Sequence, residues 1–204
     1  MQQLAFGLSP PPQPTLDNFV PGANAELIAR LREFAGGKFG ESVVYLWGEA
    51  GSGRSHLLFA VRQEAPAIHT ADDVQSFDQA RQAELFYAIN QARESGGMVL
   101  AAGDAPPAQL PLREDLRSRL AWGLVYQVKP LTDAERAVFL RAEAVRRGMP
   151  LADEVIWYLL SHVRRDLPTL LAILDELDRA SLERQRHITL PLVREALSRH
   201  LGNT

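Results

Sequence analysis

The feature that most constrains the fold of this chain is the loop at residues 48–55, which reads GEAGSGRS. It matches the phosphate-binding pattern G-x-x-x-x-G-K-[ST] at every defined position except one. The apolar segment 42–47 predicts a strand before the loop, and the segment 55–61 predicts a helix after it. In such a unit, backbone N–H groups and the helix N-terminus converge on a phosphate. The predicted nucleotide-binding residues of this loop are Gly48, Gly51, Ser52, Gly53, Arg54, Ser55 and His56.

Arg54 is the exception, because it stands where the pattern has a lysine. A lysine carries a compact charge whereas an arginine is a wide planar fork, so the exchange is not conservative at a phosphate site. The chain is also strongly biased against lysine, since only Lys38 and Lys129 of its 22 basic residues are lysines. We therefore expect the chain to bind a nucleotide, and the sequence leaves open whether it hydrolyses one.

The composition excludes several classes of protein. The net charge of −3 and the pI near 6.0 do not indicate a strong direct DNA-binding surface. There is no cysteine, which excludes disulfides, thiolate metal sites and cysteine nucleophiles. No apolar run is long enough for a membrane span, and the N-terminus does not resemble a signal peptide. These observations favour a cytoplasmic protein that is not bound to a membrane.

The order of the predicted elements indicates an α/β fold with a parallel sheet, followed by a helical bundle. Strands are predicted at 42–47, 67–71, 98–102 and 124–128, and helices at 25–34, 55–61, 79–93 and 113–120. Strands that alternate with helices are typical of a parallel sheet between helical layers. After residue 131 only helical patterns follow, and Thr132 and Glu135 form a capping box before the first of them. These last helices are predicted at about 132–148, 153–164, 168–182 and 190–201.

This order predicts three parts of the chain. A proline-rich tail spans residues 1–14, an α/β nucleotide-binding domain spans residues 15–130, and a helical lid domain spans residues 131–204. The prolines at 10–14 favour an extended polyproline conformation, so the tail is expected to be stiff and exposed.

Asp72 and Asp73 end the predicted strand 67–71. In phosphate-loop enzymes the first carboxylate of such a pair holds Mg²⁺, and the second position polarises the attacking water. The alternative is a helix N-cap, because Val74 and Gln75 could begin a turn. With the phosphate loop upstream we favour the functional interpretation, in which Asp72 and Asp73 hold Mg²⁺ together with Ser55.

Several strings are similar to a known family. Residues 15–24 read TLDNFVPGAN, residues 51–58 read GSGRSHLL and residues 116–123 read LRSRLAWG. They resemble the AAA+ module of DnaA-related replication proteins, and most closely the Hda family of DnaA regulatory inactivators, whose loop also carries an arginine. The resemblance covers almost the whole chain, and the 116–123 string is its most specific part.

The resemblance implies roles for several residues. Phe19 and Val20 would contact the adenine, and Asp104 would be the first sensor residue. Arg119 would be an arginine finger that acts in trans on a partner's nucleotide, and Arg165 would be the second sensor in the lid. The alternative for both arginines is an ordinary solvated or ion-paired surface residue. The implied cofactor is ADP or ATP, with Mg²⁺ as a further candidate.

The N-terminal tail also resembles an Hda feature. Residues 3–8 read QLAFGL, which is similar to the peptide by which the family docks on the DNA polymerase sliding clamp. A Gln amide with spaced apolar side chains can fill a preformed pocket. The predicted clamp-binding residues are Gln3, Leu4, Phe6 and Leu8. The alternative is a chance match in a terminal segment without a function.

The chain departs from the family in one respect. Only 16 residues separate Ser55 from Asp72, which leaves room for one helix and one strand. The family sheet has the order 5-1-4-3-2, so removal of strand 2 would leave 5-1-4-3. We therefore expect a four-stranded sheet in which residues 67–71 form an edge. The alternative is that this sequence has lost a segment that the fold needs.

Three functions follow from these expectations. The first is an Hda-like negative regulator of replication initiation that binds ADP and the sliding clamp and promotes hydrolysis of DnaA-bound ATP. The second is an autonomous AAA+ ATPase of the helicase-loader type. The third is a clamp-binding scaffold without a working nucleotide site. The first leads because the resemblance implies it. We expect no origin-binding domain, and the oligomeric state stays open.

Overall fold

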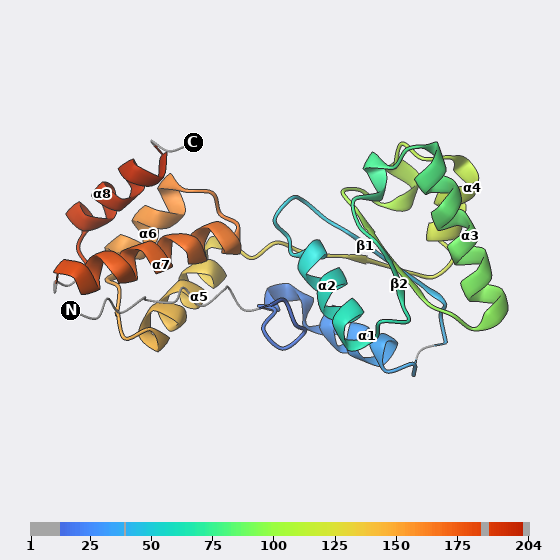
Figure 1. Ribbon diagram of the computed structural model, residues 1–204, viewed down its shortest axis with the longest axis horizontal. Coiled ribbons are helices and arrows are strands. Elements are labelled where there is room, and N and C mark those ends of the chain that lie inside the picture. Colours follow the sequence, from blue (N-terminus) through green and yellow to red (C-terminus); the bar gives the residue numbers. More distant parts are fainter. Residues whose placement is uncertain (1–12, 39, 185–187, 202–204) are drawn as a thin grey trace, which may run out of the picture.

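The computed structural model describes residues 13–38, 40–184 and 188–201. Figure 1 shows two parts joined by the extended segment that follows the sheet. The first part alternates strands and helices along the chain. Its strands are β1 (Val43–Trp47), β2 (His69–Ala71), β3 (Val99–Gly103) and β4 (Leu124–Gln127). Its α-helices are α1 (Ala25–Ala35), α2 (Arg54–Glu64), α3 (Gln79–Ser95) and α4 (Glu114–Leu120).

The four strands form one parallel sheet in the order β2-β3-β1-β4. In the family numbering this order is 3-4-1-5, which is the predicted order read from the other edge. β2 and β4 are the two edge strands of the described sheet, and β2 pairs with β3 through the register Thr70↔Leu100. The prediction of a four-stranded α/β sheet with 67–71 at its edge is therefore confirmed.

Helices cover both faces of the sheet (Figure 1). Side chains alternate along β1, so Val44 and Leu46 pack with α1 and α2, whereas Val43 and Tyr45 pack with α3 and α4. β1 is buried almost throughout because it lies between β3 and β4 under helices on both faces. Buried apolar strands of this kind are typical of α/β proteins. The loop after β1 is therefore attached to the most rigid part of the sheet.

The second part is a bundle of four helices with its own core. Its elements are α5 (Asp133–Arg146), α6 (Asp153–His162), α7 (Leu167–Arg184) and α8 (Leu190–Leu201). Apolar residues from all four helices are buried together, among them Leu140, Ile156, Leu174 and Val193. The predicted capping box begins α5, since Thr132 Oγ1 accepts from the Glu135 N–H and Glu135 Oε2 accepts from the Thr132 N–H.

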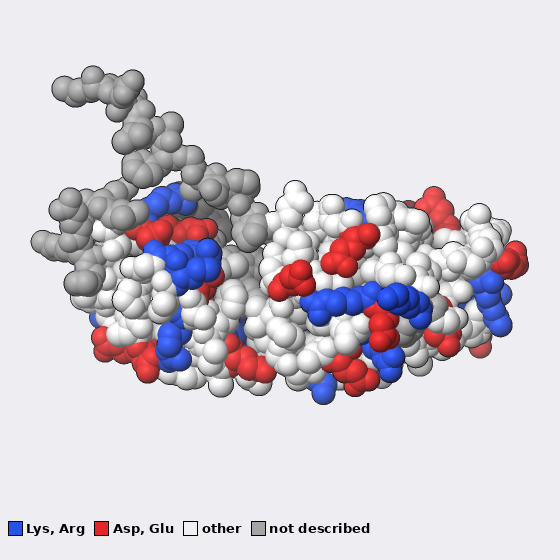
Figure 2. Space-filling view, turned by 90° about the horizontal axis from the view of Figure 1, so that it is seen from below, with Lys and Arg blue, Asp and Glu red and all other residues white. Residues whose placement is uncertain are grey.

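The predicted clamp-binding residues Gln3, Leu4, Phe6 and Leu8 lie outside the described residues. Among the helices that the structure describes, none combines the length and the apolar character needed to cross a membrane. On the face of the molecule shown in Figure 2, acidic side chains border the basic ones. This mixed face is in keeping with the net charge of −3.

Candidate nucleotide-binding site

The loop between β1 and α2 leaves no room for a Cβ at two positions, and at one of them the backbone also favours glycine. Gly53 has φ 101° and is the N-cap of α2, and a Cβ there would lie 2.6 Å from the Phe19 ring. At Gly48 a Cβ would lie 2.4 Å from the Val128 carbonyl oxygen. The glycine spacing of the sequence pattern thus reflects two close approaches, one to the segment that precedes α1 and one to the chain after β4.

A cavity of about 250 Å³ opens over this loop. Nine of the residues predicted to bind the nucleotide line it: Phe19, Val20, Gly51, Ser52, Gly53, Arg54, Ser55, His56 and Arg165. The cavity wall thus combines the segment before α1, the phosphate loop and the helical bundle. Gly48 and Asp104 do not line it, since Gly48 lies at the base of the loop and Asp104 lies beyond the end of β3.

Two buried polar groups of the loop have no hydrogen-bond partner among the described residues. Ser52 is 6% exposed, and its Oγ makes no hydrogen bond. The Nη1 atom of Arg54 is likewise buried without a partner. Buried donors are normally paired, and leaving one unpaired costs on the order of 1–3 kcal/mol. Both residues line the cavity, so a phosphate bound over the loop would lie beside these two groups. The loop therefore fits a phosphate group.

The second guanidinium nitrogen of Arg54 faces the acidic pair. Arg54 Nη2 lies 3.6 Å from Asp73 Oδ1, and the Arg54 side chain is only 11% exposed. Asp73 has φ 48°, the one described non-glycine residue in the left-handed region, and is followed by the short turn Val74–Ser76. Its side chain makes no capping hydrogen bond to that turn. The N-cap interpretation of Asp72 and Asp73 predicts a turn after them. That turn is present, but the Asp73 side chain does not cap it.

The two carboxylates are already engaged by groups of the chain. Asp72 Oδ1 accepts the Asp73 N–H at 2.9 Å, and Asp73 Oδ1 accepts the Gln75 side-chain amide at 3.1 Å as well as facing Arg54. Within the described ranges, no three His, Asp or Glu side chains gather in a way that could hold a metal ion. Asp73 Oδ1 thus accepts from the Gln75 amide and pairs with the Arg54 guanidinium.

Asp104 lies next to the acidic pair rather than in the cavity. Its backbone N–H donates to Gln75 Oε1 at 3.3 Å, so the turn after β2 is tied to the end of β3. Beneath it, the Tyr45 hydroxyl donates to the Ala105 carbonyl at 2.8 Å. Burial raises the pKa of Tyr45, and the nearby Asp104 carboxylate raises it further. Tyr45 is therefore neutral and acts as a fixed hydrogen-bond donor under the site.

The helical bundle contributes a second cationic wall. Arg165 Nη1 lies 3.1 Å from Asp133 Oδ2, and Arg136 Nη1 lies 2.9 Å from Asp133 Oδ1. Asp166 accepts from the backbone N–H and the hydroxyl of Thr169, which caps the start of α7 beside the cavity.

Sequence reasoning did not include several of the residues that line the cavity. These are Asn18, Lys129, Leu131, Arg136, Asp166, Leu167 and Pro168. Asn18 directly precedes Phe19, and three others directly follow Arg165, so extending both predicted segments by a few residues would have found them. Lys129, Leu131 and Arg136 carry no local signal, because only the path of the chain after β4 brings them to the cavity.

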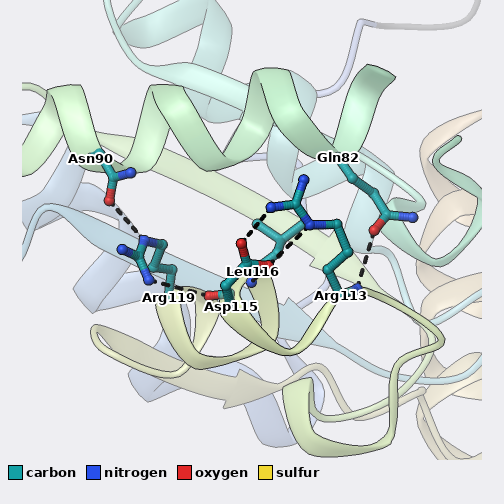
Figure 3. A network of polar contacts seen from close by, with 6 residues as sticks. All are labelled: Gln82, Asn90, Arg113, Asp115, Leu116 and Arg119. Atoms are coloured by element: carbon teal, nitrogen blue, oxygen red, sulfur yellow. Dashed lines mark hydrogen bonds and ion pairs between the residues drawn. The ribbon is translucent and has the colours of Figure 1, made fainter. Parts of the chain in front are cut away.

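Arg119 lies away from the cavity, on the surface where α4 packs against α3 (Figure 3). Its Nε donates to Asn90 Oδ1 at 2.8 Å, and its guanidinium carbon lies 4.2 Å from the centroid of the Phe86 ring and 4.5 Å from that of Trp122. We call Phe86, Asn90, Arg119 and Trp122 the α3–α4 arginine cluster. Trp122 is 45% exposed, so the cluster is accessible from outside.

The comparisons with known proteins agree with this architecture. Residues 133–197 match the family model described as Hda, lid domain. Domain III of DnaA from Thermotoga maritima has a TM-score of 0.74 at 21% identity, over 92% of this chain and 96% of that one. AMPPCP-bound DnaA from Aquifex aeolicus has a TM-score of 0.71 at 21% identity, over 84% of this chain and 67% of that one. A Thermotoga maritima RuvB mutant has a TM-score of 0.66 at 16% identity, over 92% of this chain and 72% of that one.

The parallel sheet, the loop after β1 and these likenesses show the class of fold: the chain has the fold of DnaA domain III and of RuvB, an α/β domain followed by a helical bundle. The match to the Hda lid-domain model covers residues 133–197, which form most of the helical bundle.

Proposed function

We propose that this protein is a negative regulator of replication initiation that promotes hydrolysis of ATP held by DnaA. The observation that carries the proposal is the position of Arg119. It lies on the α3–α4 surface beside the exposed Trp122 and does not line the cavity of its own chain. An arginine in this position is suited to reach a nucleotide bound by a neighbouring molecule.

The step that Arg119 would assist is phosphoryl transfer in the partner's site. Negative charge spreads over the γ-phosphate oxygens in the transition state, and a guanidinium supplied in trans stabilises that charge. Asn90 and the rings of Phe86 and Trp122 hold the Arg119 guanidinium on its own surface, so part of its ordering entropy is lost before the partner binds. We therefore treat Asn90, Phe86 and Trp122 as positioning residues.

The cavity of this chain would hold ADP as a structural ligand. Ser52 and Arg54 offer unpartnered donors to the phosphates, and Phe19 and Val20 line the part of the cavity expected to receive the adenine. Arg165 would approach the phosphates from the lid as the second sensor. Asp73 Oδ1 pairs with Arg54, which would weaken this carboxylate as a group that polarises an attacking water and argues against hydrolysis in this site.

We further propose the division of labour that the sequence predicts. The tail 1–14 would dock on the DNA polymerase sliding clamp through Gln3, Leu4, Phe6 and Leu8. The α/β domain 15–130 would carry the phosphate loop and Arg119, and the lid domain 131–204 would close on the nucleotide. The separate cores of the sheet and of the four-helix bundle support the last two assignments.

The test is a reconstituted assay that contains DnaA–ATP, clamp loaded on DNA, and this protein. We expect stimulated ATP hydrolysis that requires the clamp and that is lost when residues 1–8 are deleted, with ADP binding unchanged. If the protein does not stimulate hydrolysis, the proposal fails. Turnover by the isolated chain that is lost in Asp73→Asn would instead favour an autonomous ATPase.

A further inference from the structure

The contact between Arg54 and Asp73 bears on how a nucleotide is held. We propose that the Arg54 guanidinium takes the place of the divalent cation at this site, so that the protein binds nucleoside diphosphates without a metal. This inference rests on the proposed nucleotide site, because it concerns the same cavity and the same phosphate loop.

The first step concerns the position of the guanidinium. Arg54 is the first residue of α2, directly after the Gly53 N-cap, and it lines the cavity. One of its terminal nitrogens lies 3.6 Å from Asp73 Oδ1, and the other is buried without a partner. The group therefore lies between the phosphate loop and the acidic pair. In phosphate-loop proteins, a cation that bridges the phosphates and the acid occupies this region.

The second step concerns Asp73, whose carboxylate is held by the chain. Its backbone is in the left-handed region at φ 48°, and it also accepts from the Gln75 amide. A non-glycine residue persists in this conformation only where its surroundings impose it. A divalent cation at Asp73 would meet the Arg54 charge within a few ångströms and would be repelled by it. Metal and guanidinium would therefore compete for this carboxylate.

The third step is the charge that surrounds the phosphates. The cavity is lined by four cationic side chains, Arg54, Lys129, Arg136 and Arg165, and by one carboxylate, Asp166. Asp133, which pairs with Arg136 and Arg165, offsets part of this positive charge, and the remaining excess attracts anions. A diphosphate normally shares its charge with a metal ion, but here cationic side chains from the loop, the linker and the lid supply the compensating charge. An additional cation would therefore add little affinity.

The experiment is titration calorimetry of the full chain with ADP, once with Mg²⁺ and once with EDTA. For the native sequence we expect the two dissociation constants to agree within about twofold. Arg54→Lys replaces the planar fork by a point charge that cannot bridge the carboxylate and two phosphate oxygens. This variant should bind ADP about tenfold more tightly with Mg²⁺ than with EDTA. Arg62→Lys, on the exposed face of the same helix, is the matched control and should behave as the native chain does.

The outcomes separate this inference from the proposed function. A loss of ADP affinity of about tenfold or more in EDTA for the native chain overturns the inference and leaves the nucleotide site in place. Absence of ADP binding in both buffers overturns both. Thermal unfolding of the native chain with ADP, in Mg²⁺ and in EDTA, gives the same comparison without any variant, and equal shifts of the midpoint support the inference.

Discussion

Two arginines of this protein lie in opposite environments. Arg54, in the phosphate loop, is 11% exposed and leaves one buried terminal nitrogen without a partner. Arg119, in the α3–α4 arginine cluster, is partly exposed, donates to Asn90 and packs on the rings of Phe86 and Trp122. Arg54 thus has a buried donor without a partner among the described residues, whereas Arg119 is held in place by its own surface.

The difference is what the two proposed roles require, a ligand site at Arg54 and a surface that acts on a partner at Arg119. A buried unpaired donor is costly, so the Arg54 region gains stability when an anion fills it. A guanidinium between aromatic rings is stable without a ligand and can be presented repeatedly to a changing partner. If this comparison holds, changes at the two sites should have separable effects.

The largest expected effect is on stimulated hydrolysis. Arg119→Ala should lower the rate of DnaA-bound ATP hydrolysis on the order of 10³-fold, because the charge that stabilises the transition state is lost. Calorimetry should show unchanged ADP affinity for the variant itself. Arg117→Ala, which removes a neighbouring arginine of the same helix, is the control and should keep most of the stimulation. If Arg119→Ala stimulates hydrolysis as fully as the native protein does, Arg119 is not the residue that acts on the ATP of the partner.

The next effect is on nucleotide binding. Gly53→Ala introduces a Cβ at φ 101° and only 2.6 Å from the Phe19 ring, so the loop must change its path. ADP affinity should fall by about tenfold or more in calorimetry. Gly37→Ala is the control, because Gly37 also has a positive φ, 66°, but a Cβ added there would have no heavy atom within 4 Å. This control should lower the stability of the protein and leave its affinity for ADP unchanged. Equal losses of ADP affinity in both variants would refute the explanation by the contact with Phe19.

A smaller effect is expected from a substitution of Asn90, which orients the Arg119 guanidinium. Asn90→Ala removes the acceptor at 2.8 Å from Arg119 Nε, while Phe86 and Trp122 still pack on the guanidinium. We expect stimulated hydrolysis to fall about fivefold to tenfold, since one charge-assisted hydrogen bond is lost. Trp122 fluorescence should change, and the melting temperature should not. Gln91→Ala, at the exposed neighbouring position, is the control; an equal effect of both variants would argue against positioning.

The smallest effect is on the stability of the lid. Burial of Asp166 tends to raise the pKa of its carboxyl, but the hydrogen bonds from Thr169 and the charge of Arg164 lower it overall. A lowered pKa means that the charged cap stabilises the native state at neutral pH and that this contribution is lost as the pH falls through the native-state pKa. Asp166→Asn keeps the capping oxygen and removes the charge, so it should cost about 0.5 kcal/mol in denaturant unfolding at pH 7.

The pH dependence provides the check on this last prediction. The difference in stability between the native sequence and Asp166→Asn should shrink as the carboxyl is protonated in acid. Glu154→Gln, in the exposed first turn of α6, is the control and should show a smaller difference at pH 7. If the difference in stability between the native sequence and Asp166→Asn does not depend on pH, the charge of Asp166 does not stabilise α7.

Much of the fold could be predicted from the sequence, because the signals are local or depend on chain length. The strand before the phosphate loop and the Thr132–Glu135 capping box are read from short patterns, and both are found in the structure. The short interval between Ser55 and Asp72 leaves room for one strand only, which makes β2 an edge. Helix ends were less accurate, as α6 ends at His162 rather than near residue 164.

The contacts within the site could not be predicted in the same way. The left-handed backbone of Asp73 and its approach to Arg54 depend on how the end of β2 meets the start of α2. Arg136 reaches the cavity only because the bundle packs beside the phosphate loop. The aromatic surroundings of Arg119 combine residues from two helices and the turn after α4. These are properties of the tertiary structure, which spacing in one sequence does not encode.

The shortened sheet also limits how copies of this protein can associate. Its outer strand β2 has three residues, His69–Ala71, so it can offer few backbone hydrogen bonds to another chain. Short edge strands are poor templates for strand addition. Growth of the sheet from one molecule into the next is therefore disfavoured at this edge, and a helical surface such as the α3–α4 arginine cluster is the better place for a partner.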